Sequence, residues 1–211
     1  MSMQPITIAL AKGRLAELAV ELLEVCGLDC QQVRHPERKL VLYDEAGEYR
    51  FVLVKPSDVP IYVERGVADI GVVGKDTLME KNPSLYEMLD LGYGKCRFAL
   101  AVPQGSDFYG TYQNRVIASK YPNVTKMYFA EKGMDVSVIK IEGSVELAPL
   151  VGLSNGIVDI VQTGTTLKEN GLVPIETVAP VSARLIVNTA SMKLCQQEIF
   201  DFIDRIEAQL G

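Results

Sequence analysis

The stretch Gly66-Val67-Ala68-Asp69-Ile70-Gly71-Val72-Val73-Gly74 resembles a second one, Gly156-Ile157-Val158-Asp159-Ile160-Val161-Gln162-Thr163-Gly164. The offset between the two is constant, from 66 and 156 to 74 and 164, and Gly, Asp, Ile and Gly coincide. Each stretch has the pattern of a helix end, a glycine, a short buried strand and a second glycine. The repeat therefore indicates two similar α/β lobes.

Outward from the repeat, short apolar runs alternate with helical periodicity along the whole chain. Such alternation predicts mixed, largely parallel sheets covered by helices on both faces. The expected strands are residues 6–10, 40–43, 49–54, 69–73, 97–102, 115–119, 136–141, 157–161 and 184–187. The expected helices are residues 15–26, 57–66, 123–133 and 144–152, a short one from Leu167, and 199–210, with N-caps at Ser57, Asn123 and Ser144.

Two lobes predict a cleft between them, where ligands commonly bind. The chain order also leaves the C-terminal helix free to return to the first lobe. We therefore expect a discontinuous first lobe, residues 1–94 plus 178–211, and a second lobe of residues 95–177.

Composition excludes several classes of function. The chain has 211 residues, 48% of them apolar, and a formal net charge of −6, which argues against a nucleic-acid binder. No apolar run approaches the ~20 residues needed to span a bilayer, and residues 1–10 show no secretion signal. The four cysteines have no CxxC spacing, and His35 is the only histidine, so a zinc site is not expected. We expect reduced thiols in a cytoplasmic protein.

The strongest local pattern for chemistry is the end of the second repeat, where a strand leads into Thr163-Gly164-Thr165-Thr166. Gly164 permits a tight turn, so that successive N–H groups and three hydroxyls can point at one anion, next to a helix N-terminus. Asp159 lies just before this turn and is placed to accept hydrogen bonds from sugar hydroxyls. The alternative is a plain strand–turn–helix connection, and local physics does not separate the two.

Cationic residues follow other expected strands. Lys12-Gly13-Arg14 comes directly after the first strand, where open α/β sheets place ligands. Arg34, His35, Arg38 and Lys39 form a further cationic stretch, and Lys55 ends another strand. Arginine binds phosphate through two parallel hydrogen bonds, whereas lysine acts as a point charge. Each segment is equally compatible with a solvated loop, and His35 is expected at the surface.

The chain shows no acid–base constellation and no arrangement that would activate a nucleophile. A phosphate-binding turn with scattered cations suits a reaction in which the substrate supplies the nucleophile and the leaving group is highly anionic.

At this point the residues resemble a known family. Nine positions match, at every spacing, the signature of ATP phosphoribosyltransferase: Glu146, Gly152, Ser154, Ile157, Asp159, Thr163, Gly164, Thr166 and Leu167. The resemblance extends to residues 11–15, 56–60, 66–76, 146–152 and 182–188, which is essentially the whole chain. Lys55 is a departure, because many members have arginine there, and its role is in doubt.

The resemblance implies an α/β, two-lobed fold like that of periplasmic binding proteins (type II). It also implies the first reaction of histidine biosynthesis, Mg²⁺-dependent attack of N1 of ATP on C1 of phosphoribosyl pyrophosphate. Carried over to this sequence, the family pattern assigns Lys12, Gly13, Arg14 and Asp76 to ATP, and Arg14, Arg38 and Lys12 to catalysis. It assigns Asp159, Thr163, Gly164, Thr165, Thr166 and Glu142 to phosphoribosyl pyrophosphate. No metal ligand from the protein is expected, because Mg²⁺ arrives on the substrates.

The chain resembles the short form of the family, which lacks a C-terminal regulatory domain. That form implies a regulatory subunit similar to histidyl-tRNA synthetase and a homodimer within a hetero-octamer. Two alternatives stay open, a two-lobed binding protein without catalysis and a phosphoribosyltransferase that acts on another base.

Overall fold

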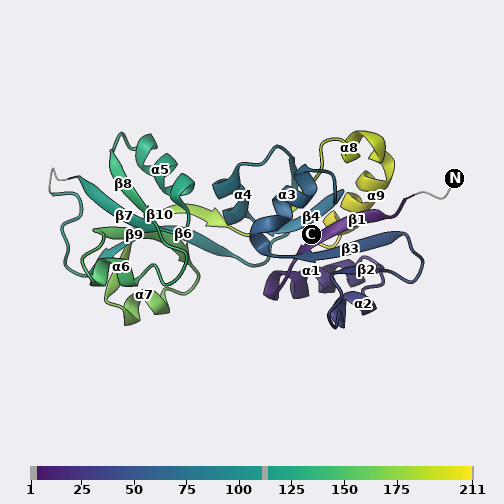
Figure 1. Ribbon diagram of the computed structural model, residues 1–211, viewed down its shortest axis with the longest axis horizontal. Coiled ribbons are helices and arrows are strands. Elements are labelled where there is room, and N and C mark those ends of the chain that lie inside the picture. Colours follow the sequence, from purple (N-terminus) through teal and green to yellow (C-terminus); the bar gives the residue numbers. More distant parts are fainter. Residues whose placement is uncertain (1–3, 111–113, 211) are drawn as a thin grey trace. The chain divides into compact units, whose positions relative to one another are not determined.

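The computed structural model describes residues 4–110 and 114–210 (Figure 1). The chain divides into two compact units. Unit 1 comprises Met1–Gly94 and Ser182–Gly211, and unit 2 comprises Lys95–Val181. The chain returns to unit 1 after Val181 rather than after residue 177, because the strand that ends at Val181 is paired within unit 2 over its whole length.

Unit 1 contains a six-stranded sheet with the order β2-β3-β1-β4-β11-β5. Strands β3, β1 and β4 are neighbours and run parallel, so their carboxyl ends lie at one edge of the sheet. The pairings of β2, β11 and β5 are antiparallel. The strands are β1 (Ile6–Ala11), β2 (Val41–Tyr43), β3 (Tyr49–Val54), β4 (Ile70–Gly74), β5 (Tyr86–Asp90) and β11 (Ala183–Val187).

Helices cover both faces of this sheet. On one face, α1 (Arg14–Val25), α2 (Gln31–Arg34) and α9 (Gln196–Glu207) bury side chains in a core that includes Phe51 and Phe202. On the other face, α3 (Val59–Glu64) and α4 (Lys75–Lys81) pack against Ala9 and Ala11 of β1. Each large side chain buried in this way contributes about 1.5–3 kcal/mol to folding. A 3₁₀ turn (Pro56–Asp58) precedes α3, and α8 (Ser191–Leu194) precedes α9.

Unit 2 contains a five-stranded sheet with the order β10-β6-β9-β7-β8. Strands β9, β7 and β8 run parallel, and β6 and β10 are antiparallel to their neighbours. Helix α5 (Pro122–Glu131) lies on one face, and α6 (Leu147–Leu150) and α7 (Thr165–Glu169) lie on the other (Figure 1). The strands are β6 (Cys96–Pro103), β7 (Arg115–Ser119), β8 (Val136–Lys140), β9 (Gly156–Val161) and β10 (Leu172–Val181).

Five strands of the first sheet, β3-β1-β4-β11-β5, have the same order and directions as β8-β7-β9-β6-β10 of the second, but the sequence repeat does not align their equivalent residues. Val72 of β4 lies opposite Leu10, the residue before the last of β1. In unit 2, Ile157 of β9 holds the same position opposite Ala118 of β7. The repeat would instead match Val72 with Gln162. The repeat therefore identified two similar lobes correctly, although its register differs from the structural one.

Several local expectations were wrong. The sheets are mixed, but less parallel than the strand–helix alternation indicated. Ser57 does not cap α3, because a 3₁₀ turn intervenes and the helix begins at Val59. Helix α5 begins at Pro122, before Asn123, and α7 begins at Thr165 rather than Leu167. Helix α6 is a single turn that begins after Glu146, so Ser144 is not its cap. Within the described part of the chain, no helix is long and apolar enough to cross a membrane.

Candidate functional site

The carboxyl ends of β7, β8 and β9 lie at one edge of the sheet in unit 2, because these strands are parallel. The segment that follows β8 contains Glu142, and the segment that follows β9 contains Thr163–Thr166. Strand β7 separates β8 from β9, which sets the two segments about 10 Å apart. The structure therefore brings the residues predicted for phosphoribosyl pyrophosphate to one edge.

The turn after β9 is built around Gly164, whose φ of 81° lies in the left-handed region. The Oγ1 atoms of Thr163 and Thr165 are 3.0 Å apart, and Thr163, Thr165 and Thr166 are exposed. The first amides of a helix have no acceptor within it, and the N–H of Thr165 donates to Oγ1 of Thr163 at 3.4 Å. Helix α7 has only five residues, so these amides and hydroxyls, rather than a long helix dipole, make the turn attractive to an anion.

Asp159 lies within β9, two positions before the strand ends, rather than at its end. Strand alternation places it on the same face as Ile157 and Val161, the face covered by α6 and α7. Its Oδ1 accepts a hydrogen bond of 2.8 Å from the backbone N–H of Ile160. Asp159 is half-buried, so its carboxylate is held in place next to the turn.

Glu142 is exposed and forms an ion pair with Lys140, the last residue of β8. Its Oε1 lies 2.6 Å from Nζ of Lys140, and its side chain is 71% exposed. An exposed pair of this kind contributes less than about 1 kcal/mol and exchanges readily with a ligand.

The corresponding edge of unit 1 collects the residues predicted for ATP. Lys12 directly follows β1, and its backbone N–H donates to the carbonyl oxygen of Val54 at 2.9 Å. Gly13 has a φ of 97°, which lets the chain turn so that α1 begins at Arg14. Asp76 follows β4 and folds back over it: a Cβ on Gly74 would lie 2.1 Å from Asp76 Oδ1. Lys12, Gly13, Arg14 and Asp76 therefore share one edge.

A cavity of about 630 Å³ opens beside Lys12 and Gly13 in unit 1. Its other wall is the loop from Arg34 to Leu40, which carries the predicted cationic stretch. The Arg34 guanidinium donates to Glu24 from Nε at 2.7 Å, and this contact raises the pKa of Arg34 and lowers that of Glu24. The charge of Arg34 is thus already neutralised by a neighbour.

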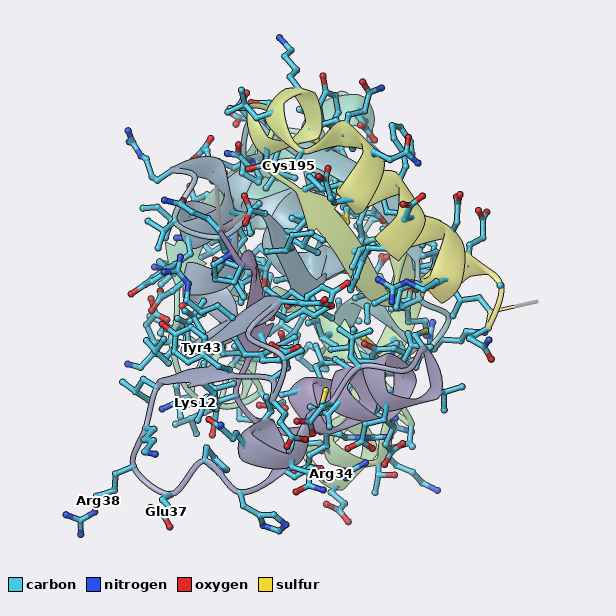
Figure 2. All side chains as sticks on the ribbon, turned by 90° about the vertical axis from the view of Figure 1, so that its right-hand side faces the viewer. Lys12, Arg34, Glu37, Arg38, Tyr43 and Cys195 are labelled. Carbon is cyan, nitrogen blue, oxygen red and sulfur yellow. The ribbon has the colours of Figure 1, made fainter. Side chains whose placement is uncertain are left out.

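Arg38 lines the same cavity, but Figure 2 shows its guanidinium directed outward, away from Lys12. The backbone of the preceding residue, Glu37, has a φ of 49°, an uncommon value for a residue other than glycine. Arg14 does not line the cavity, and His35 is exposed, as expected. The structure therefore places Lys12 and Arg38 at one cavity and directs the tip of Arg38 to solvent.

The chemistry available at these edges is the binding of anions. Burial raises the pKa of Cys30 to about 12, so this thiol is a poor nucleophile. In residues 4–110 and 114–210, no three His, Cys, Asp or Glu side chains gather as metal ligands do. Sequence reasoning passed over Lys75, although it directly follows β4, as Lys12 follows β1.

Comparisons with known proteins identify the family of this chain. A family model described as ATP phosphoribosyltransferase (HisG) matches residues 55–208. The ATP phosphoribosyltransferase of Clostridium kluyveri is 53% identical over 206 residues, covering 98% of this chain and 94% of that protein. That of Listeria monocytogenes serotype 4a is 53% identical over 205 residues, covering 97% and 96%.

Solved structures give the same result. A chain of the "ATP phosphoribosyl transferase (HisG:HisZ) complex from Thermotoga maritima" has a TM-score of 0.84 and 35% identity, over 97% of this chain and 98% of that one. The periplasmic aliphatic sulphonate binding protein SsuA from Escherichia coli has a TM-score of 0.60 at 10% identity, over 99% and 73%, a likeness of fold alone. The predicted periplasmic-binding-protein-like fold is confirmed.

The family model and this degree of identity over nearly the whole length lead to one conclusion. The chain belongs to the ATP phosphoribosyltransferase family, whose reaction is the first step of histidine biosynthesis.

Proposed function

We propose that the two substrates are divided between the two edges. The turn Thr163–Thr166 binds the 5-phosphate of phosphoribosyl pyrophosphate, Asp159 accepts hydrogen bonds from the ribose hydroxyls, and Glu142 assists them. Lys12, Gly13, Arg14 and Asp76 bind ATP. The observation that carries this proposal is the exposed turn at Gly164, whose hydroxyls and first helical amides suit a phosphate monoester.

The reaction then needs little covalent chemistry from the protein. N1 of the adenine ring attacks C1 of the ribose, the C1–oxygen bond breaks, and pyrophosphate leaves with the bonding electron pair. The substrate supplies the nucleophile, so catalysis consists of positioning and of neutralising the charge of the leaving group. We assign that neutralisation to Arg14, Arg38 and Lys12. Arg38 has to rotate its exposed side chain inward to take part.

Mg²⁺ enters on the polyphosphates rather than on a protein site. The edge around Lys12 and Arg14 presents cations, and a divalent cation prefers carboxylate and phosphate oxygens. The donor set of the described residues therefore suits a metal already bound to substrate, and no step is assigned to a protein-bound ion.

The chain is proposed to act as the short form, in the cytoplasm, with a regulatory subunit that resembles histidyl-tRNA synthetase. The support is the coverage of 98% of the Thermotoga maritima chain, which comes from a two-component complex by its own description. A homodimer within a hetero-octamer is the assembly that the sequence resemblance implies.

The test is a structure with phosphoribosyl pyrophosphate bound, combined with pyrophosphate release from ATP and phosphoribosyl pyrophosphate. We expect the 5-phosphate against Thr163–Thr166 and release that stops when ATP is replaced by orotate or a free purine. A phosphate seated elsewhere would overturn the assignment of the turn. Binding without pyrophosphate release, with the regulatory subunit present, would favour the non-catalytic alternative.

A further inference from the structure

A lysine directly follows each of the three parallel strands in unit 1. Lys55 follows β3, Lys12 follows β1 and Lys75 follows β4. These strands are neighbours in the order β3-β1-β4, so the three lysines leave the sheet side by side at its carboxyl edge. That edge is the one where Arg14 and Asp76 also lie.

The register fixes the spacing of the three backbones. Ala11 is opposite Val54, so Lys12 and Lys55 are at the same level on adjacent strands. Leu10 is opposite Val72, so Lys12 is level with Gly74, and Lys75 comes one residue later. Neighbouring strands are about 4.8 Å apart, which brings the three lysine backbones within roughly 10 Å.

The charges at this edge are not balanced. Within the described part of the chain, Lys12 and Lys55 have no ion pair, and only Lys75 has a partner. Its Nζ lies 2.6 Å from Oε2 of Glu87 on β5. Asp76 adds a second carboxylate at this edge. Counting both Glu87 and Asp76, the three lysines still carry an excess of positive charge, which attracts a polyanion.

Glu87 has a second partner that makes Lys75 exchangeable. Nη1 of Arg184 on β11 lies 3.3 Å from Oε1 of Glu87, and its Nη2 lies 2.9 Å from Oδ2 of Asp90. The Arg184 side chain is only 19% exposed, so this contact is the more permanent one. If Lys75 turns to a phosphate, Glu87 keeps Arg184 and is not left unpaired, so the exchange costs little.

We propose that Lys75 is a further ATP-binding residue: its ammonium moves from Glu87 to the polyphosphate, where it forms a row of three cations with Lys12 and Lys55. The proposal rests on the proposed binding of ATP at this edge. The proposal also gives Lys55 a role. In that row a lysine suffices as a point charge, and the bidentate contact of an arginine is not required.

Four variants test the proposal by calorimetry with ATP, AMP and phosphoribosyl pyrophosphate. Lys75→Gln is expected to weaken ATP binding about tenfold, with a smaller effect on AMP, which has fewer phosphates to contact. Glu87→Gln, which frees Lys75, is expected to tighten ATP binding. Lys81→Gln, at the exposed far end of α4, is the matched control and should bind as the unchanged chain does. Lys12→Gln tests whether ATP binds at this edge at all.

Opposite signs for Lys75→Gln and Glu87→Gln support the exchange. If both variants lower the melting temperature and leave ATP binding unchanged, the pair is structural and the proposal fails. If Lys12→Gln weakens ATP binding but Lys75→Gln does not, only the role of Lys75 is overturned. If neither does, ATP does not bind at this edge. If Lys75→Gln does not fold, the change in ATP affinity of Glu87→Gln tests the proposal, because that variant keeps Lys75. Tighter ATP binding supports the exchange, and unchanged or weaker binding contradicts it.

Discussion

At the scale of single residues, Gly164 makes possible the turn that we propose binds the 5-phosphate. Its φ of 81° is strained for any side chain with a Cβ. We predict that Gly164→Val weakens the binding of phosphoribosyl pyrophosphate by at least about tenfold and that of ATP much less. Isothermal titration with each substrate measures both. Gly133→Val is the control, because Gly133 has a similar φ of 66° after the last turn of α5, away from the turn. Equal losses for both substrates would contradict the assignment.

Arg14 is the second residue whose role can be isolated. It is exposed at the first position of α1, so its removal should leave the fold intact. We predict that Arg14→Ala lowers the single-turnover rate about a hundredfold, as expected when one donor to developing negative charge is lost (about 3 kcal/mol). Arg65→Ala, an exposed arginine at the end of α3, should retain full activity. Unchanged chemistry in Arg14→Ala would remove that residue from the mechanism.

At the scale of elements, α5 and β10 are joined by one carboxylate. Glu176 of β10 accepts hydrogen bonds from the Lys132 ammonium and from the hydroxyls of Tyr109 and Tyr128. The Lys132 contact first, then the two tyrosines, lower the pKa of Glu176 from 4.5 to about 2. A carboxyl with a lowered pKa adds stability that is complete above its ordinary value and is lost as the pH falls toward the lowered one.

We therefore predict that Glu176→Gln destabilises the protein at pH 7 by about 1–2 kcal/mol. It should also flatten the loss of stability between about pH 4.5 and pH 2. Urea unfolding at several pH values measures both effects. Glu169→Gln in the same unit is exposed and should leave the profile unchanged. A variant that keeps the acid dependence of the unchanged chain would show that other carboxyls cause it.

The buried central strands were predictable from sequence, whereas two exposed or irregular edge strands were not. The strands that became β1, β3, β4 and β9 are predominantly apolar, and most of their side chains are buried. The two strands missed are sheet edges: β5 is largely exposed, and β10 contains Pro174 and Pro180 and two irregularities in its pairing with β6. Helix α4 was missed because seven residues show too little periodicity.

The candidate site divides in the same way. The turn at Gly164 and the cations after β1 are contiguous in sequence, so local physics could single them out. The contacts of Lys75 depend on the register of β4, β11 and β5, which lie far apart in the chain, and no local pattern contains that information. The direction of the Arg38 side chain is likewise set by the loop around Glu37 and not by its neighbours in sequence.

At the scale of the whole molecule, the role of Mg²⁺ can be separated from the stability of the protein. We predict that EDTA abolishes pyrophosphate release but leaves the melting temperature of the substrate-free chain unchanged, since in the proposed mechanism the ion arrives with the phosphates. Thermal unfolding and the activity assay, each with and without EDTA, measure the two effects. Excess Mg²⁺ should restore the activity. A lower melting temperature in EDTA would reveal a metal held by the protein itself.

The pairing of β5 with β11 has a consequence for the ancestry of this architecture. These antiparallel neighbours, with Arg184 opposite Asp90, are the last strand before unit 2 and the first strand after it. Geometrically they are the two arms of a hairpin whose connecting loop has been replaced by the whole of unit 2. A tight turn of a few residues would close that hairpin again without breaking one ladder bond in the larger sheet. Unit 2 thus has the topology of an inserted domain, placed between two adjacent strands of the unit 1 sheet.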